Sequence, residues 1–254
     1  DVIISGHTHR THRTSLHVGN TLIVSSGSNC SYLGVLDLTL SGRTVAVRDY
    51  RLVPLDSSIG EDPGITARVE GFVQDIDALY LRDLGFISGQ VIAWTPFAFE
   101  TPAYGYANHG ELRLGNLITD AFADAVRRAE GNRFRPVDAV IEPLGMIRNS
   151  LATGAITIDD AFQVLSLGRG PDGQPGYPLV APYVTGSDLL TILEVGPTLA
   201  LIKGDVHLQF KGVRFAFNPC RLPLNRVTRA ELVDDDGRVR PIVPDSLYRI
   251  CVNL

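Results

Sequence analysis

The spacing of hydrophobic and polar residues divides the chain into a strand-rich beginning and a mixed remainder. Strands are predicted where β-branched or alternating apolar residues occur, at 21–25, 35–40 and 45–52. Turns are predicted beside them at Gly19-Asn20 and Ser41-Gly42. Residues 1–55 are therefore expected to form strands, and the turn-rich segment 54–64 is the best domain boundary.

A helix is expected to follow this boundary. Asp62 is a good N-cap, and Pro63 suits the first helical position. The apolar residues after them fall on one face at helical spacing: Ile65, Val69, Phe72, Val73, Ile76, Leu79 and Tyr80. We expect this face to pack against a domain.

From residue 90 onward, helical and strand patterns mix. Apolar positions from Leu114 to Ala129 predict a long amphipathic helix that ends near Gly131. Asp236-Gly237 between two strand-like segments predicts a hairpin. The other predicted elements are strands at 137–142 and 178–185, helices at 161–165 and 187–195, and alternating strands at 206–217. The mixture predicts an α+β fold, with domain segments 1–55, 56–89 and 90–254.

Composition limits the function classes. The chain of 254 residues is 44% hydrophobic and 20% charged, which is typical of a folded protein. Its net charge of −5 argues against binding a nucleic acid polymer, although a small anionic substrate stays compatible with a few local arginines. No apolar run reaches the roughly 18–20 residues that span a bilayer. Cys220 and Cys251 either pair or stay free, and buried free thiols are the favoured interpretation.

His7 and His9 are the main candidates for chemistry. They follow the apolar run Val2-Ile3-Ile4 and Gly6, a pattern that predicts a buried strand delivering two imidazoles to the edge of a sheet. Each neutral ring offers one nitrogen to Zn²⁺ or Mn²⁺. His12 and His17 lie in a polar segment, and we expect them at the rim rather than among the ligands.

Several segments resemble one known family in consistent order along the chain. Ile4-Ser5-Gly6-His7-Thr8-His9 resembles the last metal-binding motif of calcineurin-like metallophosphoesterases. Other segments resemble the 5′-nucleotidase branch, which includes UDP-sugar hydrolases and 2′,3′-cyclic phosphodiesterases. They are 23–38, Gly115-Asn116-Leu117-Ile118-Thr119-Asp120-Ala121, Gly145-Met146-Ile147-Arg148 and Tyr248-Arg249-Ile250-Cys251-Val252-Asn253.

The resemblance implies a fold and an activity. The expected fold is the C-terminal edge of a metallophosphoesterase β-sandwich, a linker helix and a mixed 5′-nucleotidase-type substrate-recognition domain. The expected activity is hydrolysis of a nucleotide or related phosphoester by a water activated on two divalent metal ions, Zn or Mn. Alternatives are a non-catalytic ligand-binding relative and a thiosulfohydrolase-like member. By resemblance the protein is also expected in the periplasm or outside the cell.

The resemblance further implies that the chain is truncated at both ends. The family's other metal ligands would precede Asp1, and a Gly-Gly-Asp-Gly loop would follow Leu254. His7 and His9 would then be an incomplete metal site. The 254-residue chain alone is accordingly expected to be inactive.

In the second domain, the resemblance points to three candidate substrate-binding residues: Arg148, Leu167 and Arg169. Arg148 matches a family arginine, and its alternative interpretation is a surface salt bridge. Leu167 stands where the family stacks a base on Phe, and Arg169 stands where the family commonly has Asn. Losing a base–aromatic stack costs about 1–3 kcal/mol of binding, so the resemblance favours the phosphohydrolase class over a nucleotidase in particular.

The segment 168–178 contains four Gly and three Pro, which excludes a helix or a central strand. A substrate-binding loop, with Tyr177 as a stacking face, and a rigid structural turn are both compatible with it.

Overall fold

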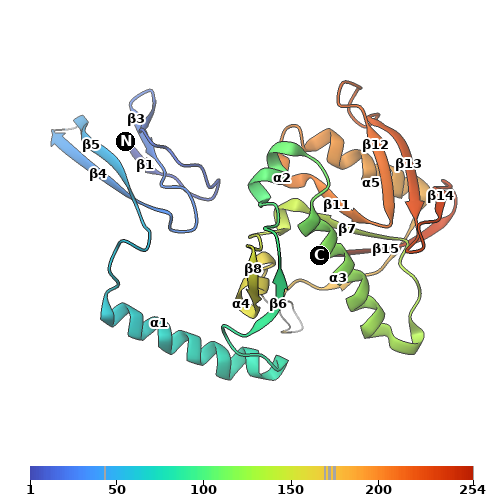
Figure 1. Ribbon diagram of the computed structural model, residues 1–254. Coiled ribbons are helices and arrows are strands. Elements are labelled where there is room, and N and C mark those ends of the chain that lie inside the picture. The colour runs from blue at the N-terminus through green and yellow to red at the C-terminus, as the bar shows by residue number, and fades with distance from the viewer. Residues whose placement is uncertain (43, 169, 171–172, 174–175, 254) are drawn as a thin grey trace. The chain divides into compact units, whose positions relative to one another are not determined.

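The computed structural model describes residues 1–42, 44–168, 170, 173 and 176–253. These residues form two compact units, Asp1–Gln74 and Asp75–Leu254. Each unit is described by itself below, because their relative placement is not determined (Figure 1).

The first unit contains a three-stranded sheet in the order β1-β3-β2. Its strands are β1 (Val2–Ile4), β2 (Leu16–Val18) and β3 (Thr21–Val24). β1 pairs with β3 in parallel, and β2 pairs with β3 in antiparallel fashion. Leu22 and Val24 of β3 are buried, whereas Ile3 and Ile4 are 47% and 84% exposed. The first strand therefore forms as predicted, but the prediction that it is buried is wrong: β1 is an edge strand with exposed side chains.

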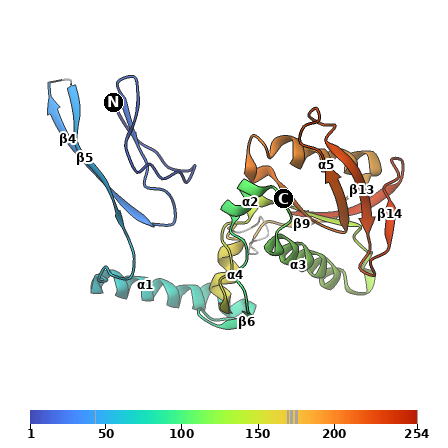
Figure 2. The same cartoon turned by 45° about the horizontal axis from the view of Figure 1, so that its top comes forward.

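A long hairpin completes the strands of this unit. β4 (Tyr32–Ser41) pairs with β5 (Thr44–Pro54) in antiparallel register, with an irregularity between Asp37 and Leu38. The predicted strands at 35–40 and 45–52 lie inside these longer strands. Both are visible as the paired blue arrows of Figure 2.

Helix α1 (Pro63–Ile76) begins where the sequence predicts. The Asp62 carboxylate accepts hydrogen bonds from the amides of Gly64 and Ile65, which satisfies two of the free donors at the helix start. A π-helical turn (Asp77–Leu81) and a 3-10 turn (Arg82–Leu84) continue it to Gly85, whose φ is +81°. No side chain of α1 is buried within the described units, and the prediction that its apolar face packs on a domain stays a prediction.

The second unit is built on a five-stranded mixed sheet. Four strands follow the order β10-β15-β7-β11, and β9 also pairs with β15. The strands are β7 (Ala139–Pro143), β9 (Leu179–Val180), β10 (Tyr183–Thr185), β11 (Leu208–Lys211) and β15 (Leu247–Asn253). β7 and β15 are parallel, and the other pairs are antiparallel.

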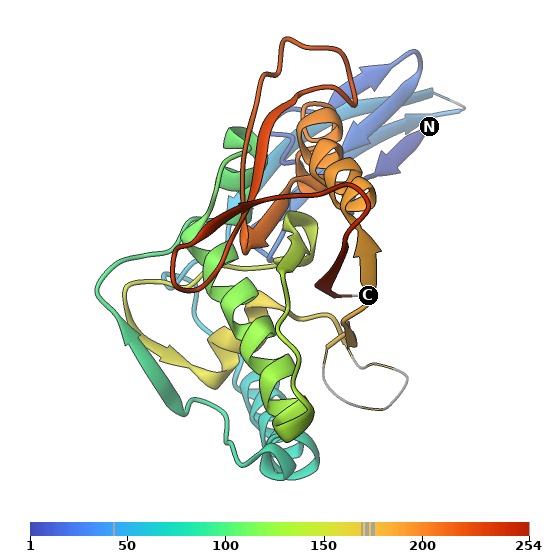
Figure 3. The ribbon, with the colours of Figure 1, turned by 90° about the vertical axis from the view of Figure 1, so that its right-hand side faces the viewer.

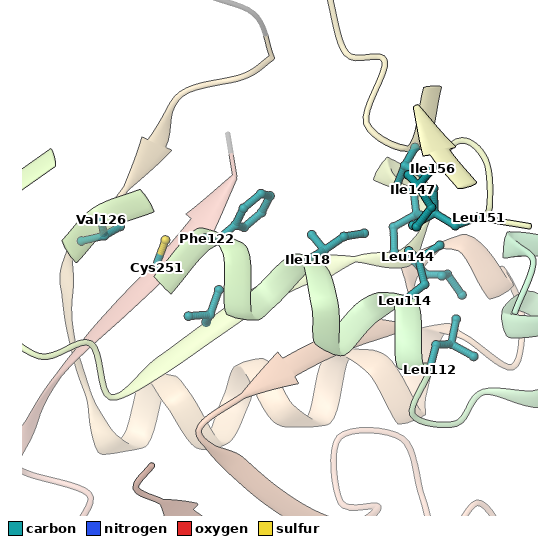
Figure 4. Close-up of a cluster of buried hydrophobic side chains, with 12 residues drawn as sticks. Leu112, Leu114, Ile118, Phe122, Val126, Leu144, Ile147, Leu151, Ile156 and Cys251 are labelled. Atoms are coloured by element: carbon teal, nitrogen blue, oxygen red, sulfur yellow. The ribbon is translucent and has the colours of Figure 1, made fainter. Parts of the chain in front are cut away.

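Two helices cover opposite faces of this sheet, as the light green and orange helices of Figure 3 show. They are α3 (Arg113–Glu130) and α5 (Gly186–Leu199). Successive strand residues point to opposite faces, and β7 follows this rule. Val140 packs with Ile118 and Phe122 of α3, while Ala139 and Ile141 pack with Leu189 and Leu193 of α5. Figure 4 shows the α3 cluster as a row of side chains beside Cys251 of β15.

Smaller elements frame the sheet. The short helices are α2 (Pro102–Asn108) and α4 (Ile158–Val164), and the short strands are β6 (Val91–Thr95), β8 (Gly154–Thr157), β12 (Val213–Phe217), β13 (Val227–Val233) and β14 (Val239–Pro241). β6 pairs with β8, and β12, β13 and β14 form a separate antiparallel sheet. Three-residue 3-10 turns lie at Gly131–Arg133, Leu144–Met146 and Gly204–Val206.

The mixed architecture confirms the predicted α+β fold class. α3 ends at Gly131 as expected, and Asp236-Gly237 forms the turn between β13 and β14. α5 is longer than the predicted helix at 187–195, because Leu199 and the interior Pro197 still belong to it. The three-segment domain division at residues 55 and 89 stays a prediction.

Candidate functional site

The turn that carries His7 and His9 is fixed at both ends to the segment that ends β3. Before it, the Ser5 amide donates to the Val24 carbonyl at 2.8 Å, and after it the His12 amide donates to the Ser25 carbonyl at 2.9 Å. The Ser25 hydroxyl donates to the Arg10 carbonyl at 2.6 Å. The turn between these anchors is therefore held at the end of a strand, as the sequence predicts for a ligand-bearing loop.

Both candidate histidines are exposed and have positive φ angles, 59° for His7 and 58° for His9. Left-handed backbone is uncommon for residues other than Gly, so two such residues in one turn mark a special local geometry. This geometry leaves both imidazole rings accessible at the turn. Their nitrogens suit a borderline divalent ion such as Zn²⁺.

Within the described ranges, no group of three or more His, Cys, Asp or Glu residues is placed to hold a metal ion. A protein zinc site needs at least three protein ligands. His7 and His9 thus have suitable donor chemistry but do not form a complete metal site by themselves.

The two other histidines of this unit differ from that pair. His17 is exposed on β2, and its residue pairs with Leu22 of β3. His12 is half-buried, and its Nδ1 has no hydrogen-bond partner among the residues the structure describes. The expectation that both lie at a rim stays a prediction.

In the second unit, Arg148 follows the end of the buried strand β7 and the turn Leu144–Met146. Its amide donates to the Val164 carbonyl at 2.8 Å, while its side chain is exposed. The guanidinium forms no hydrogen bond or ion pair with any residue in the described part of the chain. It is therefore free to receive a polar or anionic ligand, which is the alternative to the surface salt bridge.

The sequence analysis missed Tyr106, which lies in the field of Arg148, and Asp205, which lies in the field of Tyr106. The pKa of Tyr106 is raised by burial and by the negative charge of Asp205, while the positive charge of Arg148 opposes the rise. Asp205 also lies against the turn before Arg148. A Cβ atom added at Gly145 would lie 3.0 Å from the backbone carbonyl oxygen of Asp205. Its Oδ1 is buried without a described partner, and its Oδ2 pairs with Lys203 at 3.2 Å.

Leu167 is buried at 8% exposure, and its amide donates to the Leu165 carbonyl at 2.8 Å. Arg169 and residues 171–172 and 174–175 lie outside the described residues. Tyr177 is 43% exposed. The substrate-binding roles of Arg148, Leu167 and Arg169 remain predictions.

A polar group inside the core was also missed. Glu142 on β7 is fully buried, and both of its carboxylate oxygens lack a hydrogen-bond partner among the described residues. Burial raises its pKa to about 8. A single Glu within the apolar segment Ala139–Pro143 was the signal available in the sequence.

The family comparison decides the identity of the second unit. The model of the 5′-nucleotidase C-terminal domain matches residues 91–254. The chain belongs to the 5′-nucleotidase family.

Individual 5′-nucleotidases extend this match to the whole chain. The 5′-nucleotidase of Diplobatis ommata is 26% identical over 238 residues, which cover 91% of this chain and 38% of that protein. The 5′-nucleotidase precursor of Thermus thermophilus has the same fold, with a TM-score of 0.77 and 24% identity over 99% of this chain and 49% of that one. The sulfate thiohydrolase SoxB of Thermus thermophilus also shares the fold, with a TM-score of 0.59 and 21% identity over 100% of this chain and 42% of that one. The chain thus spans less than half the length of these relatives.

Two further expectations were tested. Cys30, Cys220 and Cys251 are free, so the favoured interpretation of unpaired thiols is confirmed. Only Cys251 is buried, and the expectation of burial is wrong for the other two. No helix in the described part of this 5′-nucleotidase family member has the length and apolar character to cross a membrane.

Proposed function

We propose that this chain is part of a phosphoric ester hydrolase of the 5′-nucleotidase family that acts on a nucleotide or a related phosphoester. The observation that carries the proposal is the exposed guanidinium of Arg148, which has no partner among the described residues and follows the central strand of a domain that belongs to this family. A planar guanidinium offers a two-pronged set of donors to an anionic or polar group.

His7 and His9 are proposed as two of the ligands of a divalent metal centre, with Zn or Mn as the ion. Their exposed turn and their ring nitrogens support this role. When bound, such ions polarise a phosphoryl oxygen and generate hydroxide from water at neutral pH. Within this chain, the anchors at Ser5 and His12 would keep both rings in position before any metal binds.

In the second unit, Arg148 would orient the organic or anionic part of the substrate. Leu167 contributes an apolar surface but no aromatic face, so we expect nucleobase recognition to be weaker than a base–aromatic stack allows. Arg169 is proposed as a further substrate contact. The precursor form named for the Thermus thermophilus relative supports a location outside the cytoplasm.

The test uses the protein at the length of its relatives. Hydrolysis of phosphomonoesters, cyclic nucleotides, nucleotide sugars and a sulfur-bearing substrate would be measured with Mn²⁺ or Zn²⁺ and after chelation. We expect metal-dependent phosphoester hydrolysis that His7→Ala or His9→Ala reduces by orders of magnitude. The matched variant His17→Ala removes an exposed imidazole outside the turn and should leave kcat within about twofold.

Three outcomes would contradict the proposal. Activity that persists in His7→Ala and His9→Ala would remove the ligand assignment. Preference for the sulfur-bearing substrate would favour the thiosulfohydrolase alternative, and ligand binding without turnover would favour a non-catalytic relative. The 254-residue chain alone should not hydrolyse p-nitrophenyl phosphate, because its described residues do not form a complete metal site.

A further inference from the structure

The second unit contains a cleft of about 600 Å³ that neither Arg148 nor Leu167 lines. Its lining includes every residue from His207 to Phe215. Because neighbouring side chains on a strand point to opposite faces, a hollow over one face would be lined by alternate residues. A hollow lined by consecutive residues runs along the edge of the strand.

The β11 part of this run has an unpaired edge. β11 is the last strand of the order β10-β15-β7-β11, and β12 is the first strand of the order β12-β13-β14. Gly212, with a φ of +78°, joins these two strands and lets the chain pass from one sheet to the other. In the part of the chain that is described, the side of β11 away from β7 therefore has no strand neighbour, and such an edge presents free backbone donors and acceptors.

The opposite wall of the cleft comes from α3. Asn116, Thr119 and Asp120 line it, and the spacing of three and four residues places them on one face of the helix. Phe210, Phe215 and Phe217 add apolar surface from the strand side. A space bounded by a strand edge and a helix face accommodates one extended chain.

The charge of the cleft is negative. Four carboxylates line it, from Glu111, Asp120, Asp234 and Asp235, against two basic side chains, from Lys211 and Arg214, and Asp234 is also paired with Arg240 at 3.2 Å. The Lys211 ammonium is already bound to Asp120 at 2.8 Å and to Asp235 at 2.9 Å. The side chains of Asp120 and Asp235 are 61% and 85% exposed, so both remain accessible to a second cation.

We propose that this cleft binds an extended, positively charged polypeptide segment, which adds as a strand to the free edge of β11, residues 208–211. Backbone hydrogen bonds to the edge would give affinity. Lys or Arg side chains would face the carboxylates of Glu111, Asp120 and Asp235, and apolar residues between them would contact Phe210 and Phe215. This site is separate from the proposed phosphoester site.

The test begins with peptides, so that the fold of the protein is unchanged. A dye-labelled Val-Lys-Val-Arg-Val peptide with blocked ends would be titrated with the 254-residue chain, and fluorescence anisotropy would be followed. We expect saturable one-to-one binding that weakens as NaCl is raised. A peptide with Glu in place of Lys and Arg, and one with N-methylated backbone amides, should each bind at least tenfold more weakly.

Protein variants then locate the site. Glu111→Gln combined with Asp120→Asn removes two charges from the cleft without changing side-chain size and should weaken the basic peptide about tenfold. The matched control combines Asp75→Asn and Asp83→Asn, which removes the same charge outside the cleft and should leave the affinity unchanged. Circular dichroism would verify that both double variants are folded.

The proposal fails if the basic peptide does not bind, if the N-methylated peptide binds equally well, or if the control variant weakens binding as much as the cleft variant. Sedimentation velocity adds a further check. A dimer of the chain that excess basic peptide does not dissociate would assign this edge to a second copy and overturn the proposal.

Discussion

Glu142 and Gln209 face each other across the antiparallel pair of β7 and β11. Of their two side chains, only that of Gln209 has hydrogen-bond partners among the described residues. The Gln209 side chain accepts from the Leu112 amide at 2.9 Å and donates to the Gly110 carbonyl at 3.2 Å. It therefore holds the segment that leads into α3. Glu142, buried beside it, has no described partner for either oxygen.

This isolation makes stability depend on pH. Burial raises the pKa of Glu142 from its ordinary value of 4.5 to about 8, so the folded state keeps a proton that the unfolded chain releases. The contribution to stability is complete below about pH 4.5 and is lost as the pH rises to about 8. The loss is at most about 5 kcal/mol.

Glu142→Gln should remove this dependence, because the amide stays neutral. Relative to the unchanged chain, we expect a gain of roughly 2–4 kcal/mol in the free energy of unfolding at pH 8 and less than about 1 kcal/mol at pH 5. Urea denaturation at both pH values measures the difference. Asp83→Asn, on an exposed residue, serves as the control, and an equal gain at both pH values would show that Glu142 is not the group that titrates.

Arg249 should contribute strongly to the stability of the second unit. This buried side chain of β15 pairs with both carboxylate oxygens of Glu130 at the end of α3 and donates to the Arg135 carbonyl at 2.6 Å. Arg249→Met should lower the free energy of unfolding by roughly 2–3 kcal/mol, because it leaves these acceptors unpaired.

The comparison for Arg249 is Arg229→Ala, which removes an exposed ion pair with Glu231. Its expected cost is below about 1 kcal/mol. Urea denaturation of both variants in parallel would compare the loss of unfolding free energy at the buried Arg249–Glu130 pair with the loss at the exposed Arg229–Glu231 pair. Equal losses would indicate that the Arg249 pair is energetically a surface interaction.

Gly204 should not tolerate a side chain. A Cβ there would lie 2.5 Å from the Tyr106 carbonyl oxygen and 2.9 Å from its Cα. Gly204→Ala must therefore push α2 away from the turn that carries Asp205, at a cost of about 1–3 kcal/mol. Gly71→Ala in α1 meets no atom within 4 Å and should instead stabilise by up to about 1 kcal/mol. Thermal unfolding of the two variants should shift in opposite directions.

Arg148→Ala should raise the KM of the longer protein roughly 10- to 100-fold, since a charged hydrogen-bond donor to the substrate is lost. Arg148→Lys keeps the charge without the planar fork, and we expect it to recover only part of the affinity. Arg238→Ala, an exposed arginine of the β13–β14 turn, is the matched control. An unchanged KM in Arg148→Ala would show that Arg148 does not bind the substrate and has a structural role instead.

Sequence signals predicted the elements that are determined by neighbouring residues along the chain. The N-cap at Asp62, the amphipathic pattern before Gly131 and the turn at Asp236-Gly237 each correspond to an observed element. α2 was missed, although its start has an equivalent signal: Thr101 caps the Tyr104 amide, and Pro102 follows it.

Contacts between distant segments were beyond the sequence signals. Exposure of β1 and α1 depends on what packs against them, and an apolar pattern alone does not identify that neighbour. The position of Asp205 beside Gly145, and of Gln209 beside Glu142, follows from strand register and turn packing. The strand-and-turn pattern supplied His7 and His9 as candidates and the family resemblance supplied Arg148, but only the structure revealed the anchored turn and the guanidinium without a described partner.

The distribution of thiols has a practical consequence. Cys30 is exposed in the first unit and Cys220 is exposed in the second, whereas Cys251 is buried and its pKa is raised to about 11 by burial. Thiolate is the reactive form, so maleimide dyes should modify one position in each unit and spare the third. The natural chain thus provides a donor–acceptor pair for single-molecule energy transfer, which would follow the separation of the two units in solution as substrate or metal is added.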